Sequence, residues 1–241
     1  MDKKDVLVTG SSSGIGLAIS LLFLQKGYRV FGLSRKDNCI LSKYENFSYI
    51  KCDVSQKTQV ENAYNIILDS AKKLDIVVHC AGIALGDNEF EDGLIEDFIE
   101  MINVNVFGSV FVFKIFLPLL QNSAQANLIS IGSIASNYQY RTGHIYAATK
   151  AFLEHLVYSI RTELQSSKLN ITLISPGRVE TNFDINRYKN DTKKANFQIK
   201  NKPYLQVEDI TNLISWIVEQ DKSLNLPKIE IVPSNGVLSY Q

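Results

Sequence analysis

Seven short runs rich in β-branched and other apolar residues alternate with helical patterns, and this alternation restricts the fold more than any other feature of the chain. The runs cover residues 5–9, 29–34, 48–53, 75–79, 127–133, 170–175 and 228–232. Between the first two, apolar residues recur at helical spacing, so a helix is expected from Gly14 to Lys26, with Gly27 able to end it. Strands separated by helices predict an α/β fold, a doubly wound and mostly parallel seven-stranded sheet with helices on both faces.

Length and composition favour a single domain spanning residues 1–241, since 45% of the residues are hydrophobic and no repeat or linker divides the chain. The 25 basic and 25 acidic residues cancel, so no overall field would draw the protein to nucleic acid or to an acidic membrane surface. The most apolar stretch, residues 110–120, contains Lys114 and Pro118 and is shorter than the roughly 20 residues that cross a bilayer. We interpret it as a buried helix and expect no membrane partner.

The cysteines and the N-terminus bear on the compartment. Cys39, Cys52 and Cys80 are odd in number and show no C-x-x-C spacing, which argues against a disulfide framework and against a zinc site. The N-terminal residues contain no apolar region long enough for a signal peptide. No metal is therefore expected, and a reducing cytoplasm is the expected location.

A glycine-rich turn, Thr9-Gly10-Ser11-Ser12-Ser13-Gly14-Ile15-Gly16, directly follows the first predicted strand and opens the first predicted helix. Glycines permit a tight turn, and backbone N–H groups at a helix N-terminus can bind a pyrophosphate, although such a turn can also be purely structural. The spacing resembles the T-G-x-x-x-G-I-G signature of the short-chain dehydrogenases/reductases, a family with a Rossmann-like fold. The resemblance implies dinucleotide contacts from Gly10, Ser12, Ser13, Gly14, Ile15 and Gly16.

The end of the second predicted strand, Leu33-Ser34-Arg35, bears on which dinucleotide binds. An acid at this place commonly binds the ribose 2′-hydroxyl, whereas a basic residue accommodates a 2′-phosphate. Ser34 stands where NAD-preferring members of the family usually carry Asp, and the Arg35 guanidinium can contact a phosphate. The predicted cofactor is therefore NADP(H). The alternative is that Arg35 and Lys36 only solvate the strand end while Asp37 binds the ribose.

The resemblance implies further cofactor contacts at three other strand ends: Asp53 and Val54 beside the adenine, Ala81 and Gly82 after the fourth strand, and Pro176, Gly177, Val179 and Thr181 near the nicotinamide. Some have a local alternative, since Asp53 can cap the following helix and a Pro-Gly pair can simply form a turn. His79-Cys80 stands where the family usually has Asn-Asn, and a cysteine cannot reproduce the hydrogen bonds of an amide. A catalytic or metal-binding role for either residue is not expected.

Tyr146-Ala147-Ala148-Thr149-Lys150 puts a phenol and an ammonium on one face of a predicted helix. Together with Ser133 and Asn105 upstream, these residues match the catalytic set of the family in type and order. The resemblance implies that Tyr146 exchanges a proton with the substrate oxygen, and that Lys150 lowers the pKa of Tyr146 and bonds the nicotinamide ribose. It also implies that Ser133 hydrogen-bonds the substrate oxygen and that Asn105 holds a relay water. Taken singly, Asn105 can also be an amide that bonds within its helix.

One long polar interval, residues 183–203, stands apart from the alternation. Its local charge is +4, since two acidic residues face six basic ones: Arg187, Lys189, Lys193, Lys194, Lys200 and Lys202. It is either a lid that closes over substrate or a solvated surface loop, and long ordered loops in compact domains favour the lid. With Arg141 and Arg178, the basic lid suggests an anionic substrate such as an acyl thioester on a carrier.

The resemblance implies an oxidoreductase of the carbonyl reductase type, which transfers a hydride between NADP(H) and a small-molecule carbonyl or secondary alcohol. The alternative is a non-enzymatic NADP(H)-binding sensor or regulatory protein on the same fold, and the complete catalytic set argues against it. A sugar-nucleotide epimerase or dehydratase also carries Tyr-x-x-x-Lys but usually has a longer substrate region. The family resemblance further implies a homodimer or homotetramer, assembled through the helices that bear Asn105 and Tyr146.

Overall fold

The computed structural model describes residues 3–164, 168–194, 203–220 and 224–235. Its seven strands form one sheet in the order β3-β2-β1-β4-β5-β6-β7, and every neighbouring pair is parallel. In chain order they are β1 (Asp5–Thr9), β2 (Arg29–Ser34), β3 (Phe47–Lys51), β4 (Ile76–His79), β5 (Ala126–Ile131), β6 (Leu169–Pro176) and β7 (Lys228–Ile231). The predicted doubly wound parallel sheet is confirmed.

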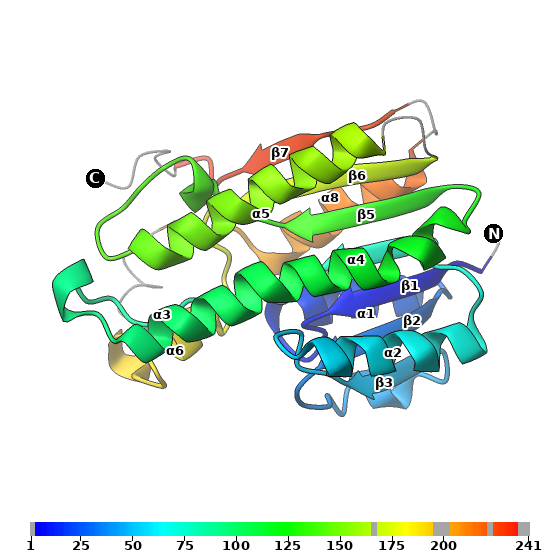
Figure 1. Ribbon diagram of the computed structural model, residues 1–241, viewed down its shortest axis with the longest axis horizontal. Coiled ribbons are helices and arrows are strands. Elements are labelled where there is room, and N and C mark those ends of the chain that lie inside the picture. The colour runs from blue at the N-terminus through cyan, green and yellow to red at the C-terminus, as the bar shows by residue number, and fades with distance from the viewer. Residues whose placement is uncertain (1–2, 165–167, 195–202, 221–223, 236–241) are drawn as a thin grey trace.

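Helices cover both faces of the sheet (Figure 1). On the near face lie α2 (Lys57–Ser70), α4 (Gly108–Gln121) and α5 (His144–Glu163), and on the far face lie α1 (Gly14–Gln25) and α8 (Val207–Glu219). The shorter elements are α3 (Ile95–Ile102), α6 (Phe183–Arg187), and the 3-10 turns η1 (Leu41–Lys43), η2 (Phe90–Asp92) and η4 (Ile134–Ser136). The first helix ends one residue before its predicted limit, and Gly27 follows with a φ of +78°, a conformation that favours glycine.

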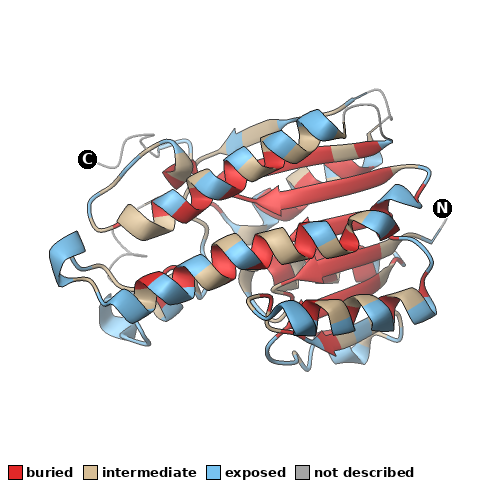
Figure 2. Ribbon diagram, in the orientation of Figure 1, coloured by how far each residue is buried: buried red, intermediate tan, exposed pale blue. Residues whose placement is uncertain are grey.

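The alternation of side chains along the strands divides the core into two layers. Leu7 and Phe31 pack on one face with the α4 residue Phe116, whereas Val6 and Val8 pack on the other face with residues of α1 and α8. Figure 2 shows the central strands as buried along their length. The strands are therefore apolar on both faces, as expected for a parallel sheet between two layers of helices.

A π-helical turn, η3 (Asn103–Phe107), joins α3 and α4 into one continuous helical stretch from Ile95 to Gln121. Among the described residues, this 27-residue stretch is the one helix long and apolar enough to cross a membrane by length and composition. It is therefore much longer than the buried helix predicted at residues 110–120. Its α4 part contacts α2, β4 and β5, and Phe113 and Phe116 are buried there, which is the packing of a core helix in an α/β domain.

Candidate active site

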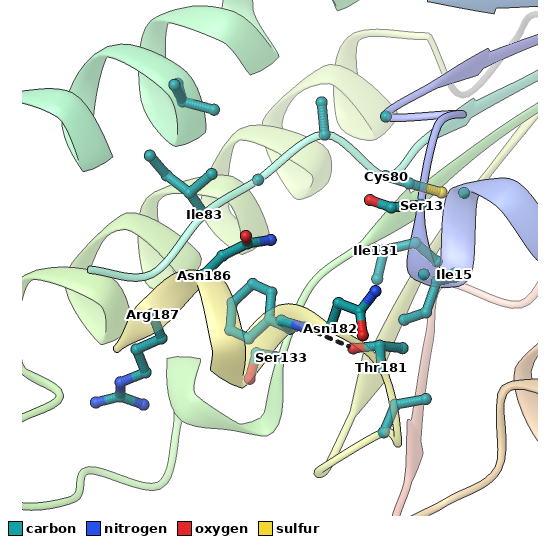
Figure 3. Close-up of a pocket in the computed structure, with 18 of the residues that line it drawn as sticks. Ser13, Ile15, Cys80, Ile83, Ile131, Ser133, Thr181, Asn182, Asn186 and Arg187 are labelled. Atoms are coloured by element: carbon teal, nitrogen blue, oxygen red, sulfur yellow. Dashed lines mark hydrogen bonds between the residues drawn. The ribbon is translucent and has the colours of Figure 1, made fainter. Parts of the chain in front are cut away.

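A cavity of about 830 Å³ opens at the carboxyl ends of the strands. Chain order reverses between the neighbours β1 and β4, and ligands of open parallel sheets bind in the crevice outside such a switch point. Every residue predicted to contact the cofactor lines this cavity, including Val54, Gly82 and Val179. In Figure 3, Ser13 and Ile15 lie toward one end of the cavity and Arg187 of α6 lies at the other.

The glycine turn after β1 is folded so tightly that side chains are excluded from it. Gly10 has a φ of +71°, and a Cβ there would lie 3.1 Å from the backbone nitrogen of Ala81. A Cβ on Gly16 would lie 2.3 Å from the carbonyl oxygen of Gly10. Helix α1, which begins in this turn, has no acidic residue in its first turn and no side-chain cap from Ser13. No side chain of the helix therefore competes for the N-terminal N–H groups, and the turn fits the pyrophosphate of a dinucleotide.

The end of β2 presents a cation and no carboxylate at the strand terminus itself. Ser34 is buried, and its hydroxyl donates to the carbonyl oxygen of Lys36 at 2.7 Å. The Arg35 side chain is 61% exposed, and its guanidinium lies 4.0 Å from the Glu100 carboxylate. An exposed pair at this distance contributes little, so the guanidinium can turn to a phosphate at the cavity rim.

Two carboxylates at the same end are engaged in local turns. Asp37 accepts hydrogen bonds from the Asn38 backbone N–H at 2.7 Å and from the Ser42 hydroxyl at 3.0 Å. Asp53 accepts from the backbone N–H and the hydroxyl of Ser55, at 3.0 and 2.7 Å. Both residues line the cavity, but these bonds reduce what each carboxylate can offer to a ribose or an adenine.

A chain of buried hydrogen bonds runs behind the cavity from β1 to the π-helical turn. The Thr9 hydroxyl accepts from the backbone N–H groups of residues 80 and 81 at 3.2 and 3.1 Å, so its own proton goes to His79 Nδ1, 3.0 Å away. The ring proton of His79 is then on Nε2, which donates to the Ser109 hydroxyl at 3.0 Å. Ser109 in turn donates to the backbone carbonyl of Asn105 at 2.6 Å.

The surroundings of His79 and Cys80 favour the uncharged form of both side chains. Burial, with a smaller effect of the Lys150 charge, lowers the pKa of His79 to about 3, so the ring is neutral at physiological pH. Burial raises the pKa of the Cys80 thiol to about 12, which keeps the unreactive thiol form. Within the described part of the chain, no group of three or more His, Cys, Asp or Glu side chains is arranged to hold a metal ion.

Three of the four predicted catalytic residues meet at the cavity. Tyr146 and Lys150 lie near the start of α5, and Ser133 is the N-cap of η4, two residues beyond the end of β5. All three line the cavity, and the Lys150 nitrogen lies 5.9 Å from the centre of the Tyr146 ring. The Ser133 oxygen accepts the backbone N–H of Ala135 at 3.1 Å, so its proton can be donated to a substrate.

Lys150 is a buried cation. Its ammonium donates to the carbonyl oxygen of Ile131 at 2.9 Å, and no carboxylate among the described residues forms an ion pair with it. Burial lowers the pKa of Lys150 to about 8. The charge is therefore held near Tyr146 in surroundings that screen it weakly.

Asn105, the fourth predicted residue, is buried and is not among the residues that line the cavity. Its side-chain oxygen accepts the backbone N–H of Ile83 at 2.8 Å, and its amide donates to the Ile83 carbonyl at 2.8 Å and to the Thr149 hydroxyl at 3.0 Å. These bonds support the alternative of a structural amide, with the difference that it bonds the loop after β4 and helix α5 instead of its own helix. A Cβ on Gly82 would lie 3.4 Å from both the Asn105 oxygen and the Lys150 nitrogen.

The segment after β6 lies against the glycine turn. The backbone N–H of Gly177 donates to the carbonyl of residue 231 in β7 at 2.8 Å. A Cβ on Gly14 would lie 3.5 Å from the Thr181 side chain. The Thr181 hydroxyl also accepts the backbone N–H of Phe183 at 3.2 Å, the bond drawn in Figure 3, and so helps to begin α6.

A family model described as short chain dehydrogenase matches residues 4–192. The chain belongs to this family. The probable NADP-dependent dehydrogenase of Haemophilus influenzae is 29% identical over 239 residues, which cover 97% of this chain and 95% of the relative. The NADP-dependent 3-hydroxy acid dehydrogenase YdfG of Salmonella typhi is 30% identical over 233 residues, covering 95% and 94%. The closed form of a serine dehydrogenase complexed with NADP+ superposes with a TM-score of 0.89 at 30% identity, covering 94% of each chain.

In this short-chain dehydrogenase, several of the cations predicted to attract an anion are paired at the surface. Three of them form ion pairs: Lys189 with Asp97, Lys194 with Asp87, and Arg141 with Glu89. The predicted lid begins with helix α6, and its residues 195–202 lie outside the described part of the chain. Arg178 lines the cavity and donates to the Tyr204 hydroxyl at 3.2 Å. Arg187 lines the cavity as well and is buried.

Three further residues, which were not predicted, bond segments that carry predicted site residues: Thr9, Ser109 and Thr149. Thr9 ends β1 directly before Gly10, a position at which a hydroxyl can bond the neighbouring strand end. Ser109 lies four residues after Asn105 on the same helix face, so its spacing could have indicated contact. Thr149 precedes Lys150, and no sequence signal distinguishes it from an ordinary helix residue.

Proposed function

We propose that this short-chain dehydrogenase transfers a hydride between NADP(H) and a small-molecule carbonyl or secondary alcohol, with Tyr146 as general acid and base. One observation carries the proposal: Tyr146, Ser133 and the buried Lys150 line the same cavity as the glycine turn after β1. A dinucleotide whose pyrophosphate lies on that turn shares this cavity with a phenol, a hydroxyl and an ammonium, which are the groups needed to exchange a proton with a substrate oxygen.

Each side chain has a role that its surroundings support. When a carbonyl is reduced, Tyr146 gives its hydroxyl proton to the substrate oxygen, and in the oxidation of an alcohol it takes that proton back. Ser133 donates a hydrogen bond to the same oxygen, where negative charge develops. Lys150, with a pKa of about 8, is positively charged at neutral pH and favours the tyrosinate form of Tyr146. The nicotinamide, when bound, supplies or accepts the hydride.

The preference for NADP(H) over NAD(H) rests on the end of β2. Ser34 offers no carboxylate to the ribose 2′-hydroxyl, and the exposed Arg35 guanidinium lies at the cavity, where it can bind a 2′-phosphate. The relatives from Haemophilus influenzae and Salmonella typhi, both named as NADP-dependent, support the same choice. With the wild-type enzyme, kcat/KM should therefore be higher for NADPH than for NADH.

The names of two similar proteins suggest the first substrates to assay. One is a 3-hydroxy acid dehydrogenase and the other a serine dehydrogenase, so small acids with a hydroxyl or carbonyl group on the third carbon come first. The carrier-bound thioester suggested by the basic segment loses support, because Lys189 and Lys194 are paired with carboxylates. A sensor without enzymatic activity is the second candidate, but it has no use for a costly buried lysine beside a tyrosine.

The decisive experiment replaces the phenol. Tyr146→Phe should lower kcat by roughly 10²- to 10⁴-fold, because the proton donor is lost, while NADPH binding measured by coenzyme fluorescence is retained. Tyr158→Phe, on the same helix, is the matched control and should leave turnover unchanged. Retained turnover in Tyr146→Phe would refute the assigned role. A wild-type protein that binds NADPH and reduces no carbonyl in a broad panel would favour the sensor.

We also propose that the enzyme works in the cytoplasm as a homodimer or homotetramer. Its three cysteines are free, as a reducing compartment requires. Apolar side chains are exposed on the helices that bear Asn105 and Tyr146, and these surfaces are suited to contact with a second copy: Ile99, Ile102, Phe107 and Phe152.

A further inference from the structure

A buried guanidinium lies at one end of the cavity, and no carboxylate of the described residues is paired with it. Arg187 is 8% exposed and lines the cavity that also contains Tyr146 and Ser133. Among the described residues, no carboxylate forms an ion pair with it. Burying an unpaired cation is costly, so a partner supplied from outside the chain is the simplest reason to keep one at this place.

Hydrogen bonds hold the guanidinium in one orientation. Its Nε donates to the carbonyl oxygen of Gly86 at 3.1 Å, Nη1 donates to the Tyr140 hydroxyl at 3.0 Å, and Nη2 donates to the carbonyl oxygen of Thr142 at 3.5 Å. The backbone N–H of Gly86 donates back to the carbonyl oxygen of Arg187 at 3.0 Å. Of the five N–H groups of an arginine, one on each terminal nitrogen is left without an acceptor among the described residues. These two groups remain to bind an anion, and charge-assisted hydrogen bonds from a guanidinium to a carboxylate are among the stronger ones in proteins.

The groups around Arg187 favour the protonated guanidinium, and no carboxylate among the described residues neutralises its charge. Burial by itself lowers the pKa of Arg187, but the hydroxyls of Tyr140, Tyr188 and Tyr146 outweigh this effect and raise it, so the guanidinium stays protonated. Tyr146 is therefore within electrostatic reach of Arg187. Asp184, the carboxylate on the same short helix, accepts the hydroxyl of Tyr204 at 2.6 Å and forms no ion pair with Arg187.

We infer that Arg187 binds the carboxylate of the substrate and thereby selects small acids whose hydroxyl or carbonyl group lies a few bonds away from that carboxylate. The inference rests on the proposed function and adds the residue that recognises the charge of the substrate. A carboxylate at Arg187 places the rest of a short acid in the cavity that Ser133 and Tyr146 line, where its oxygen can react. A thioester lacks this free carboxylate and gains nothing from the site.

A matched pair of ketones isolates the charge. Acetoacetate and methyl acetoacetate carry the same reactive ketone and differ in whether the carboxylate is free. With NADPH, the wild-type enzyme should have a higher kcat/KM for the acid. Arg187→Met should lower kcat/KM for acetoacetate by about 100-fold and change that for the ester by no more than about threefold, because only the acid loses a charged partner. Arg187→Lys keeps the charge but loses the planar guanidinium. Its kcat/KM for acetoacetate should lie between the values of the wild type and Arg187→Met.

Arg141→Met is the control, since this exposed arginine is paired with Glu89 and does not line the cavity. NADPH titration of each variant checks that the coenzyme site is folded. Equal losses on acid and ester in Arg187→Met, with NADPH binding retained, would overturn the inference and leave the proposed function standing. A wild-type enzyme with a higher kcat/KM for the ester than for the acid would also overturn the inference. This comparison needs no variant, so it holds even if Arg187→Met does not fold. A wild-type enzyme that binds NADPH and reduces neither ketone nor any other carbonyl would instead overturn the proposed function.

Discussion

At the scale of single residues, burial of the Lys150 ammonium lowers the free energy of unfolding. Lys150 is 6% exposed, and burial lowers its pKa from 10.5 to about 8. The unfolded chain retains the higher pKa, so between pH 8 and 10.5 it binds more protons than the folded chain, and stability rises with pH across this window. Below pH 8 the whole cost of the buried charge applies, and it amounts to about 3 kcal/mol.

Lys150→Met should therefore stabilise the coenzyme-free protein while it removes turnover. The variant also loses the hydrogen bond to Ile131, worth about 1 kcal/mol, so the net gain in the free energy of unfolding at pH 7 is about 2 kcal/mol. Urea unfolding at pH 7 and at pH 10 measures the gain, which should shrink at the higher pH as the wild-type lysine loses its proton. Lys114→Met, at an exposed site on α4, should change little. A variant less stable than wild type at pH 7 would contradict this account.

The sequence predicted the candidate site residues that belong to a motif of fixed spacing. It did not predict side-chain directions that depend on contacts between segments far apart in the chain. Ser133, Tyr146 and Lys150 belong to the first kind. The direction of Arg187 belongs to the second, because six cations in residues 183–203 look alike in sequence. Arg187 is turned inward by bonds to Gly86 and Tyr140, which are 101 and 47 residues away. Asn105 was predicted by residue type, but its contacts are with Ile83 and not with the cavity.

At the scale of elements, Glu154 of α5 connects the two helical segments that carry Ser133 and Tyr146. Its carboxylate accepts the Ser136 hydroxyl of η4 at 2.6 Å and pairs with Lys228 of β7 at 2.8 Å. Burial by itself raises the pKa of Glu154, but the bonds from Lys228 and Ser136 outweigh it and lower the pKa, so the carboxylate stays charged. Since Ser133 is the N-cap of η4 and α5 carries Tyr146, this carboxylate links the segments that carry these two residues.

Glu154→Ala should lower the free energy of unfolding by about 2 kcal/mol, because a buried bonded carboxylate is lost. It should also lower kcat by about tenfold through misplacement of Ser133, while the NADPH dissociation constant is unchanged. Steady-state kinetics, NADPH titration and urea unfolding give the three numbers. Glu163→Ala, at an exposed site on the same helix, is the control. A less stable variant with wild-type kcat would show that Glu154 supports the fold and does not align the site.

The limits of the strands were predicted well, because each β-branched run is bounded by turn residues. The limits of helices that follow one another without a break were predicted poorly. All seven strands lie within two residues of their predicted limits. The stretch from Ile95 to Gln121 was predicted to be helical only over residues 110–120, where Lys114 and Pro118 interrupt the apolar pattern. Neither residue ends the helix: Lys114 is exposed, and α4 continues to Gln121 although Pro118 lacks the N–H for one helical hydrogen bond.

At the scale of the whole molecule, apolar side chains stay exposed along α3, η3 and α5. Ile99 is 52% exposed, Phe107 is 49% exposed and Phe152 is 39% exposed. Helix α5 contacts both α3 and η3, so the three residues belong to neighbouring elements. A second copy that presents the same helices would bury these side chains in a two-fold symmetric interface.

Ile99→Asp combined with Phe107→Asp should therefore split a dimer into monomers, or a tetramer into dimers, because each change buries a charge in the interface. Sedimentation velocity at micromolar concentration measures the change. Ile66→Asp on α2, at a position 53% exposed, is the matched control and should leave the assembly intact. A wild-type protein that sediments as a monomer throughout this range would rule out the proposed interface.

The interior position of β1 determines when this strand gains both of its neighbours as the chain leaves the ribosome. β1 pairs with β2 on one side and with β4 on the other, and β4 ends at His79. Until that residue emerges, the strand that leads into the glycine turn is the open edge of a nascent three-stranded sheet, with unpaired N–H and C=O groups. Distant parallel strands pair slowly, so a translational pause shortly before this point would leave that edge free to join another chain.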